Sequence, residues 1–376
     1  MLCITKIILH EILLPLKEPF QISSGTAKDR RILLLQLEAG DGFTGWSECV
    51  AAERPNYSPE TVDTAWLAIR EWLAPRVLGR RFQRPEDVHH ALQEDLRGHY
   101  MAKAAVEMGA RELAAQMEGT PLARFLGGVR DKIATGISLG IQDTPTLLVE
   151  KARAALEQGY AKIKIKIKPG ADIEYISAVR EALGPDAPLM ADANSAYTLN
   201  DLSRLKELDR FGLMMIEQPL AWNDLVRHAE LQKQIATPIC LDESIISLES
   251  AEDMVALGSG RIVNIKPGRV GGFTSSLAIH DFCGQNQVAV WCGGMLESGI
   301  GRAYNVALAS LPNFTLPGDI SPSQRYWEQD IVQPEWVMDH QGMVAVPLDK
   351  PGMGVTVDLD RIDDLTVKQE ILIAQL

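Results

Sequence analysis

Short apolar runs alternate with amphipathic stretches over residues 130–320, and this alternation sets the expected fold. The apolar runs lie at 134–140, 161–167, 188–192, 213–218, 238–243, 261–266, 288–292 and 314–318. Stretches with helical spacing lie between them, for example at 144–157, 171–183, 198–209 and 271–284. Eight strands with intervening helices predict a parallel (β/α) barrel. An open doubly wound sheet is the alternative, but no GxGxxG sequence follows the first strand.

The residues before this region have strands first and helices afterwards. Strand-forming residues dominate 3–14, 31–38 and 43–49, and the glycines between the last two runs are typical of a hairpin. Helical spacing follows at 59–75, 86–96 and 100–117, and the first helix is expected to begin at Ser58, before Pro59. This order predicts an α+β domain over 1–128, a barrel over 129–325, and a segment 326–376 that returns to the N-terminal domain.

Ionisable residues stand at the ends of five consecutive apolar runs, where burying a charge is costly. They are separated by 24 to 26 residues, which is one strand and one helix per step; the five are Lys166, Asp192, Glu217, Asp242 and Lys266. In a parallel barrel the carboxyl ends of the strands form the face that carries active sites. Five charged groups in register there predict a catalytic site, with a network of structural salt bridges as the alternative.

Asp192, Glu217 and Asp242 fall on three adjacent predicted strands. Three carboxylates make a compact set of oxygen ligands that suits Mg²⁺, and Mn²⁺ can take its place. Lys166 and Lys266 fall four strands apart, which puts them on opposite walls of an eight-stranded barrel. A substrate bound at the metal would therefore lie between two amines.

Lysine and isoleucine alternate along the second predicted barrel strand. Period two places Lys162, Lys164, Lys166 and Lys168 on one face and the isoleucines on the other. Lys164 lies about 7 Å from Lys166 along the strand, and a neighbouring ammonium favours the neutral form that a base requires. We therefore expect Lys164 to assist Lys166, and Lys162 and Lys168 to be structural or solvated.

These groups predict removal of a proton next to a carboxylate. A divalent cation stabilises the negative charge that develops on the carboxylate oxygens, and a lysine takes the proton. The resulting enediolate can lose a leaving group or be reprotonated from the other face, which gives elimination or racemisation. An aldolase that forms a Schiff base and a barrel that only binds a ligand are the alternatives.

Composition limits the partners. The formal net charge of −13 argues against nucleic acid and anionic membrane surfaces. It does not exclude the expected small-molecule carboxylate substrate, because a metal ion can reverse the local sign of the charge inside a pocket. The five cysteines are scattered and form no CxxC pair, which favours a reducing compartment. The N-terminus carries charged residues and no cleavage site, and no apolar run of about 20 residues is present. The sequence therefore predicts a cytoplasmic protein.

The ordered set of motifs resembles the muconate-lactonizing subgroup of the enolase superfamily. The matching stretches are KIK (164–166), DANSAY (192–197), IEQP (216–219), LDES (241–244) and NIKPGRVGG (264–272). Residues 290–320 are similar to o-succinylbenzoate synthases of the type that also racemise N-succinylamino acids. The resemblance implies a (β/α)7β TIM-like barrel with an α+β capping domain built from the N-terminal segment and the C-terminal tail.

The same resemblance implies the reaction and the pocket. The expected reaction is dehydration of 2-succinyl-6-hydroxy-2,4-cyclohexadiene-1-carboxylate to o-succinylbenzoate, a menaquinone precursor, with N-succinylamino acid racemisation as a second activity. Dipeptide epimerisation and muconate cycloisomerisation on the same scaffold are the alternatives, and a homo-oligomer is expected. The implied substrate-binding residues are Phe20, Ser138, Asn194, Arg269, Gly294 and Met295, with Phe20 in a loop (19–25) that closes over the substrate and Arg269 at a position associated with racemisation.

Overall fold

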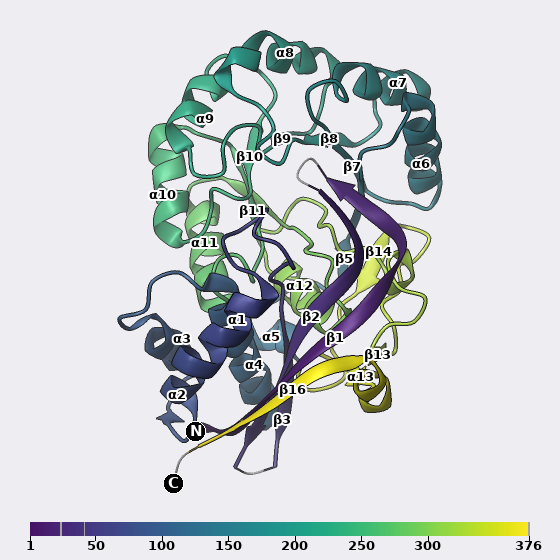
Figure 1. Cartoon of the computed structure of the whole chain (residues 1–376). Helices are drawn as coiled ribbons and strands as arrows, with labels where there is room; N and C mark the ends of the chain where they lie inside the picture. The colour runs from purple at the N-terminus through teal and green to yellow at the C-terminus, as the bar shows by residue number, and fades with distance from the viewer. Residues whose placement is uncertain (23–24, 41, 375–376) are drawn as a thin grey trace.

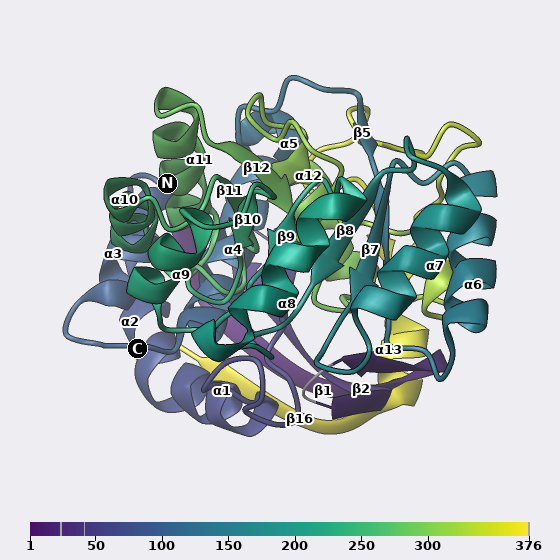
Figure 2. The same cartoon turned by 90° about the horizontal axis from the view of Figure 1, so that it is seen from above.

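The computed structural model describes residues 1–22, 25–40 and 42–374, and of residues 20–22 and 25–28 it describes the backbone alone. Two sheets organise the chain (Figures 1 and 2). The larger sheet has seven parallel strands in the order β12-β11-β10-β9-β8-β7-β6, so strands that follow each other in sequence are neighbours in space. Its strands are β6 (Gly136–Leu139), β7 (Lys162–Lys166), β8 (Leu189–Asp192), β9 (Ile216–Glu217), β10 (Ile239–Leu241), β11 (Ile262–Ile265) and β12 (Ala289–Cys292).

The eighth expected strand closes this sheet into a barrel. The segment 314–318 makes two isolated parallel bridges, Val290 with Phe314 on one side and Thr135 with Gly318 on the other. The predicted (β/α)7β barrel is therefore confirmed, and its last strand is reduced to these bridges.

Helices cover the outside of the barrel. They are α6 (Pro145–Glu157), α7 (Ile173–Leu183), α8 (Leu202–Glu207) with the 3₁₀ turns η2 (Leu199–Asp201) and η3 (Leu208–Phe211), α9 (Leu225–Gln232), α10 (Leu248–Leu257), α11 (Phe273–Gln285) and α12 (Gly299–Ala309). Ile163 and Ile165 of β7 point outward into the core shared with these helices, as period two requires. Met190, Met215, Cys240 and Trp291 form a separate cluster inside the barrel. This cluster is the apolar part of the barrel interior.

The smaller sheet belongs to the capping domain. Its antiparallel strands have the order β16-β1-β2-β3, and they are β1 (Leu2–Ile22), β2 (Gly25–Ala39), β3 (Thr44–Cys49) and β16 (Thr366–Ile373), with β4 (Arg81–Phe82) paired to β1. Because β16 pairs with β1 along the sheet edge, the C-terminal tail lies on the N-terminal domain. Helices α1 (Val62–Ala68), the π-helix η1 (Ile69–Leu73), α2 (Ala74–Val77), α3 (Glu86–Gln93) and α4 (Tyr100–Met117) share a core with the sheet.

The expected start of the first helix is wrong by a few residues. Helix α1 begins at Val62, and its N-cap is Thr61, whose hydroxyl accepts a hydrogen bond from the backbone N–H of Thr64. Ser58 instead accepts a hydrogen bond from the backbone N–H of Glu60 in the preceding turn. Thr61 and Thr64 form a reciprocal capping box, which outweighs the proline signal at Pro59.

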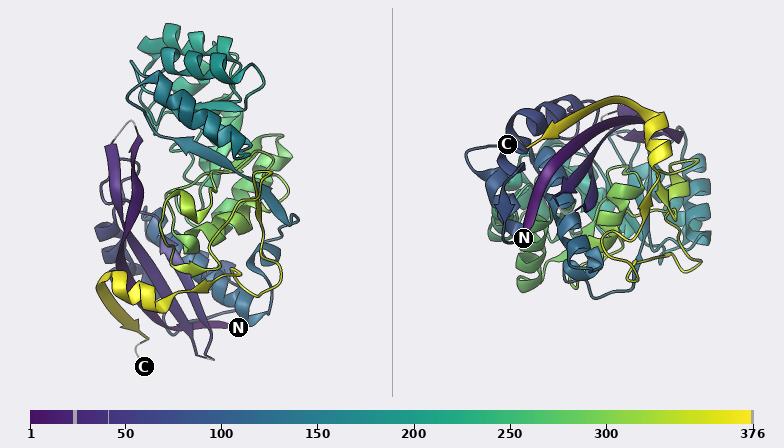
Figure 3. Two further views of the ribbon diagram at one scale, coloured as in Figure 1. Left: turned by 90° about the vertical axis from the view of Figure 1, so that its right-hand side faces the viewer. Right: turned by 90° about the horizontal axis from the view of Figure 1, so that it is seen from below.

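The long hairpin of β1 and β2 runs from the capping domain along the side of the barrel (Figure 3). Near its far end Glu18 forms an ion pair with Lys151 of α6 at 3.5 Å, and the backbone N–H of Lys17 donates to the carbonyl of Tyr326. The capping sheet also packs on the barrel directly, since the Tyr304 hydroxyl of α12 donates to the carbonyl of Trp46 in β3. The two parts therefore contact each other around the open end of the barrel.

Candidate active site

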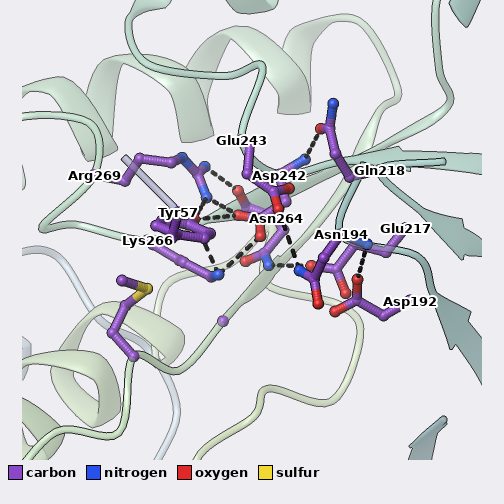
Figure 4. Close-up of polar contacts among 12 residues, drawn as sticks. Tyr57, Asp192, Asn194, Glu217, Gln218, Asp242, Glu243, Asn264, Lys266 and Arg269 are labelled. Carbon is purple, nitrogen blue, oxygen red and sulfur yellow. Dashed lines mark hydrogen bonds and ion pairs between the residues drawn. The ribbon is translucent and has the colours of Figure 1, made fainter. Parts of the chain in front are cut away.

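Four of the five predicted charged residues, Asp192, Glu217, Asp242 and Lys266, lie together at the carboxyl ends of consecutive strands (Figure 4). The fifth, Lys166, pairs in register with Asp192 from the neighbouring strand. Lys166, Asp192 and Glu217 are the last residues of β7, β8 and β9 and are paired in register across these strands. Asp242 and Lys266 each follow their strand by one residue. All five side chains are buried. As their regular spacing in the sequence predicts, the five charged side chains form a ring at the carboxyl end of the barrel.

Two lysines of β7 hold one side of this ring. The Lys166 Nζ lies 2.6 Å from Asp192 Oδ2 and donates to Asn194 Oδ1 at 2.8 Å. The Lys164 Nζ lies 3.3 Å from Asp192 Oδ2, 3.1 Å from Glu217 Oε2 and 2.5 Å from Asp319 Oδ2. Burial acts to lower the pKa of Lys164, but these three carboxylates outweigh it and raise the pKa. Lys164 therefore stays charged and balances the acidic cluster.

The opposite side is held by Lys266 and Asp242. The Lys266 Nζ lies 2.8 Å from Asp242 Oδ2 and donates to the hydroxyl of Tyr57 at 3.0 Å. The Tyr57 hydroxyl donates to Asp242 Oδ1 at 2.9 Å, and Arg269 forms an ion pair with the same oxygen. Tyr57 lies in the loop between β3 and α1, so the capping domain contributes a side chain to this wall.

The pKa values of the three carboxylates shift in different directions. Burial raises the pKa of Glu217 to about 7, and the neighbouring Asp192 adds to the rise. Burial also acts to raise the pKa of Asp192 and of Asp242, but the ammonium groups of Lys166 and Lys266 outweigh it and hold both pKa values low. An additional cation at this point would relieve the repulsion that Glu217 experiences.

The donor set fits a hard divalent cation. Asp192, Glu217 and Asp242 are ionisable oxygen donors on adjacent strands, and Glu243, next to Asp242, has a buried Oε2 without a hydrogen-bond partner among the described residues. Within the described part of the chain, no group of three or more Asp, Glu, His or Cys side chains is positioned to bind one metal ion. The Asp192 and Asp242 oxygens instead form ion pairs with Lys166, Lys266 and Arg269. A metal ion would have to displace these cations from the carboxylates.

The arrangement of the amines suits proton transfer on two faces. Lys166 ends β7 and Lys266 follows β11, four strands away in the sheet order. Asn194, one of the predicted substrate-binding residues, accepts from Lys166 and donates to Glu243 Oε1 at 3.2 Å. Its backbone has a positive φ of 41°, which places its amide N–H on Asp192 Oδ1 at 3.0 Å. Asn194 is thus part of the wall that orients Lys166.

The other predicted pocket residues are distributed around this mouth. Ser138 is buried in β6 opposite Lys164, and its hydroxyl has no hydrogen-bond partner among the described residues. Gly294 and Met295 lie after β12, where a Cβ on Gly294 would come within 2.7 Å of the Asp319 carbonyl. The backbone of Phe20 lies in β1, and its side chain is outside the described residues, as are Ser23 and Ser24 of the expected closing loop.

The side chain of Arg269 donates hydrogen bonds to several groups of the protein. Its Nε donates to the carbonyl of Ile245 at 2.7 Å, and its terminal nitrogens contact Asp242, Tyr57 and the carbonyl of Asn264. The guanidinium is buried behind Lys266. This geometry favours an effect of Arg269 on the Asp242–Lys266 pair over direct substrate contact.

A second layer of charge lies beneath the first. Lys162 is fully buried, its Nζ lies 3.2 Å from Asp319 Oδ1, and it sits over the Trp291 ring at 3.3 Å. Burial lowers the pKa of Lys162, while Lys162 and Lys164 outweigh burial at Asp319 and hold its pKa at about 2. Asp319 thus joins the two lysines, and the structural role expected for Lys162 agrees with this position.

Sequence reasoning missed three residues of the site. Asn264 donates to Glu217 Oε1 at 2.7 Å, and its position two residues before Lys266 on the same strand face is a signal that could have identified it. Asp319 directly follows the eighth apolar run and could have been found in the same way as the other strand ends. Tyr57 reaches the site from the capping domain, and no pattern in the sequence points to it.

Two families match the sequence over most of its length. Residues 147–361 match the family described as "Enolase C-terminal domain-like", and residues 4–127 match "Mandelate racemase / muconate lactonizing enzyme, N-terminal domain". No helix in the described part of the chain has the length and apolar character needed to cross a membrane.

Similar proteins extend over nearly the whole chain. An o-succinylbenzoate synthase from Bacillus subtilis (strain 168) is 46% identical, with 99% of both chains covered. An N-succinylamino acid racemase from Amycolatopsis sp is also 46% identical, over 95% of this chain and 96% of that protein. The crystal structure of an enolase-superfamily protein from Listeria innocua Clip11262 superposes with a TM-score of 0.96 at 41% identity, and the match covers 100% of both chains.

Proposed function

Because the chain belongs to the enolase superfamily, in the family of mandelate racemase and muconate-lactonizing enzymes, we propose that it is an o-succinylbenzoate synthase that also racemises N-succinylamino acids. The observation that carries the proposal is the pair of lysines that face three buried carboxylates from strands β7 and β11. The near full-length similarity to a synthase and to a racemase supports both reactions on one site.

A divalent cation is part of this proposal. Enolase-superfamily sites generally combine a Lys or His base with Mg²⁺. Asp192, Glu217 and Asp242 would hold the ion in this chain, with Mn²⁺ as a substitute. The bound cation would supply positive charge that stabilises the substrate carboxylate as it gains a second negative charge.

Lys166 acts as the base in the dehydration. Its neutral amine takes the proton on the carbon next to the carboxylate, and the electron pair of that C–H bond moves into the enediolate. The C–O bond to the ring hydroxyl then breaks, and the ring becomes aromatic. Since the elimination is syn, the same Lys166 ammonium can return its proton to the departing hydroxide, which leaves as water and restores the neutral amine.

Racemisation uses the same first step and the second lysine. One lysine takes the α-proton from one enantiomer, and the ammonium of the other delivers a proton to the opposite face of the carbanion. The positions of Lys166 and Lys266 on opposite walls support this assignment. Dipeptide epimerisation and muconate cycloisomerisation need the same charged groups, so the pocket residues decide among these substrates.

The proposal is tested by assaying both reactions on one protein with Mg²⁺. Dehydration is followed directly, and racemisation by the conversion of one pure enantiomer of an N-succinylamino acid into the other. We expect Lys166→Ala to abolish both activities and Lys168→Ala, two residues further along the chain, to retain them. Turnover retained in Lys166→Ala would refute the mechanism, and dipeptides as the preferred substrates would favour the epimerase alternative.

A further inference from the structure

The two lysines differ in which part of the molecule holds them. Lys166 contacts Asp192 and Asn194, which both come from the barrel. Lys266 contacts Asp242 of the barrel and also Tyr57, which comes from the capping domain. Among the described residues, the capping domain therefore contributes a polar contact to Lys266, while these polar contacts of Lys166 come from the barrel.

The side chain of Lys266 also packs against the backbone of Gly293. A Cβ on Gly293 would lie 2.6 Å from Lys266 Cε and 2.4 Å from Asn264 Oδ1. The side chain of Lys266 therefore rests directly on the chain at Gly293, and no methyl group fits between them. The position of the loop 293–298 sets where this lysine can lie.

Glu297 fixes that loop. Its Oε1 accepts hydrogen bonds from the backbone N–H of Met295 at 2.8 Å and from Asn305 Nδ2, also at 2.8 Å. Asn305 belongs to α12, so Glu297 ties the loop to the helix that follows it. The side chain of Glu297 is buried, which leaves these hydrogen bonds little competition from water.

Glu48 of the capping sheet fixes the start of the same helix. Its Oε2 accepts from the backbone N–H of Ser298 at 3.0 Å, from the Ser298 hydroxyl at 2.6 Å, and from the backbone N–H of Gly301 at 3.1 Å. Glu48 is 1% exposed. A carboxylate at a helix N-terminus satisfies N–H groups that otherwise lack partners and is favoured by the helix dipole. This contact joins β3 to α12 across the domain boundary.

These groups meet around a small cavity behind Lys266. It is lined by both acids, by the lysine and by the loop and helix that connect them: Glu48, Lys266, Met295, Glu297, Gly301 and Asn305 are among its lining residues. The contacts of Glu48 and the stem of Lys266 are thus parts of one packed region.

We infer that Glu48 is a positioning residue for Lys266 alone. It holds the N-terminus of α12, Glu297 transmits that position to the loop 293–298, and the loop forms the surface on which Lys266 rests. Lys166 lies outside this chain of contacts. The inference rests on the proposed function, because it requires each lysine to serve one enantiomer.

The consequence is an unequal effect on the two enantiomers. If the lysines lie on opposite faces, each removes the α-proton of one enantiomer. Loss of the Glu48 contacts should therefore slow exchange of the enantiomer that depends on Lys266, while exchange of the other enantiomer continues. A general loss of folding stability would slow both equally.

The experiment measures the initial rate of α-proton exchange in D₂O with Mg²⁺, starting from each pure enantiomer of an N-succinylamino acid that the wild-type protein racemises. Lys166→Ala and Lys266→Ala first establish which enantiomer depends on which lysine. We then expect Glu48→Ala to slow the Lys266-dependent exchange about tenfold or more relative to the Lys166-dependent exchange. Glu48→Gln, which keeps an acceptor oxygen, should restore most of the rate.

Glu112→Ala is the matched control. Glu112 of α4 is also 1% exposed and accepts from Gln116 Nε2 and from the backbone N–H of Met353, so it joins the capping helix to the C-terminal segment. Its loss should change both exchange rates by the same factor. If Glu48→Ala does not fold, Ser298→Ala removes the hydroxyl hydrogen bond to Glu48 Oε2 and should shift the ratio in the same direction by a smaller factor.

Failure of the proposed function and failure of the positioning role of Glu48 would give different results. If neither lysine variant selectively removes exchange of one enantiomer, the proposed function is refuted. If the lysine variants do so but Glu48→Ala and Ser298→Ala slow both enantiomers equally, the proposed function stands and the positioning role of Glu48 is overturned.

Discussion

Gly293→Ala is a small change with a large expected effect on catalysis. The new methyl carbon would lie 2.6 Å from Lys266 Cε and 2.4 Å from Asn264 Oδ1, where ordinary contacts begin near 3.4 Å. Neither neighbour can move freely, because Lys266 is held by Asp242 and Tyr57, and Asn264 donates to Glu217. Both side chains, or the backbone at residue 293, must therefore shift by about 1 Å.

A displacement of that size at a reacting group costs roughly 100-fold in rate, or about 2.7 kcal/mol of transition-state stabilisation. The assay is kcat for racemisation and for dehydration, with thermal unfolding measured to show that the variant is folded. Gly284→Ala is the control, because its methyl group would lie 3.6 Å from Asn313 in ordinary contact and within helix α11. A kcat for racemisation within twofold of wild type in folded Gly293→Ala would refute the contact between this loop and Lys266.

Two further predictions follow from buried carboxylates. Glu217, with a pKa of about 7, must lose its proton to bind a metal, so Mg²⁺ affinity measured by calorimetry should fall as the pH drops from 8 to 6, by up to about tenfold; a constant affinity would contradict this. Burial raises the pKa of Glu112 from 4.5 to about 7, so the fold loses stability as the pH rises from about 4.5 to about 7, and the loss is complete above that range. At pH 8, Glu112→Gln should therefore raise the free energy of unfolding measured in urea by about 3 kcal/mol, and this gain should vanish below about pH 4; equal gains at pH 8 and pH 4 would contradict the assignment.

Most of the barrel was predictable because its signals are local. Each strand is a short apolar run, and a charge directly after the run marks the strand end, as Asp192 and Glu217 illustrate. Because these charged residues are separated by a nearly constant number of residues, the sequence alone indicates that they lie at the same level of the barrel. The expectation that Lys162 is structural also followed from period two, since only residues near the carboxyl end of β7 reach the mouth of the barrel.

The contacts between the two domains could not be predicted in this way. Tyr57 lies in an irregular loop, and only the packing of the capping sheet on α12 brings its hydroxyl to Lys266 and Asp242. Glu48 reads in the sequence as one polar residue at a strand end, yet it caps a helix 250 positions later. Strand β16 mixes apolar and charged residues and gains its strand conformation from pairing with β1.

The most direct test of the site is a crystal structure of the protein grown with Mn²⁺, with anomalous scattering used to locate the metal. We expect one strong peak bonded to carboxylate oxygens of Asp192, Glu217 and Asp242. The Lys166 and Lys266 amines should be released from Asp192 and Asp242 and face each other across the bound ion. A peak at another position, or intact lysine–carboxylate pairs with no metal at these three residues, would contradict this expectation.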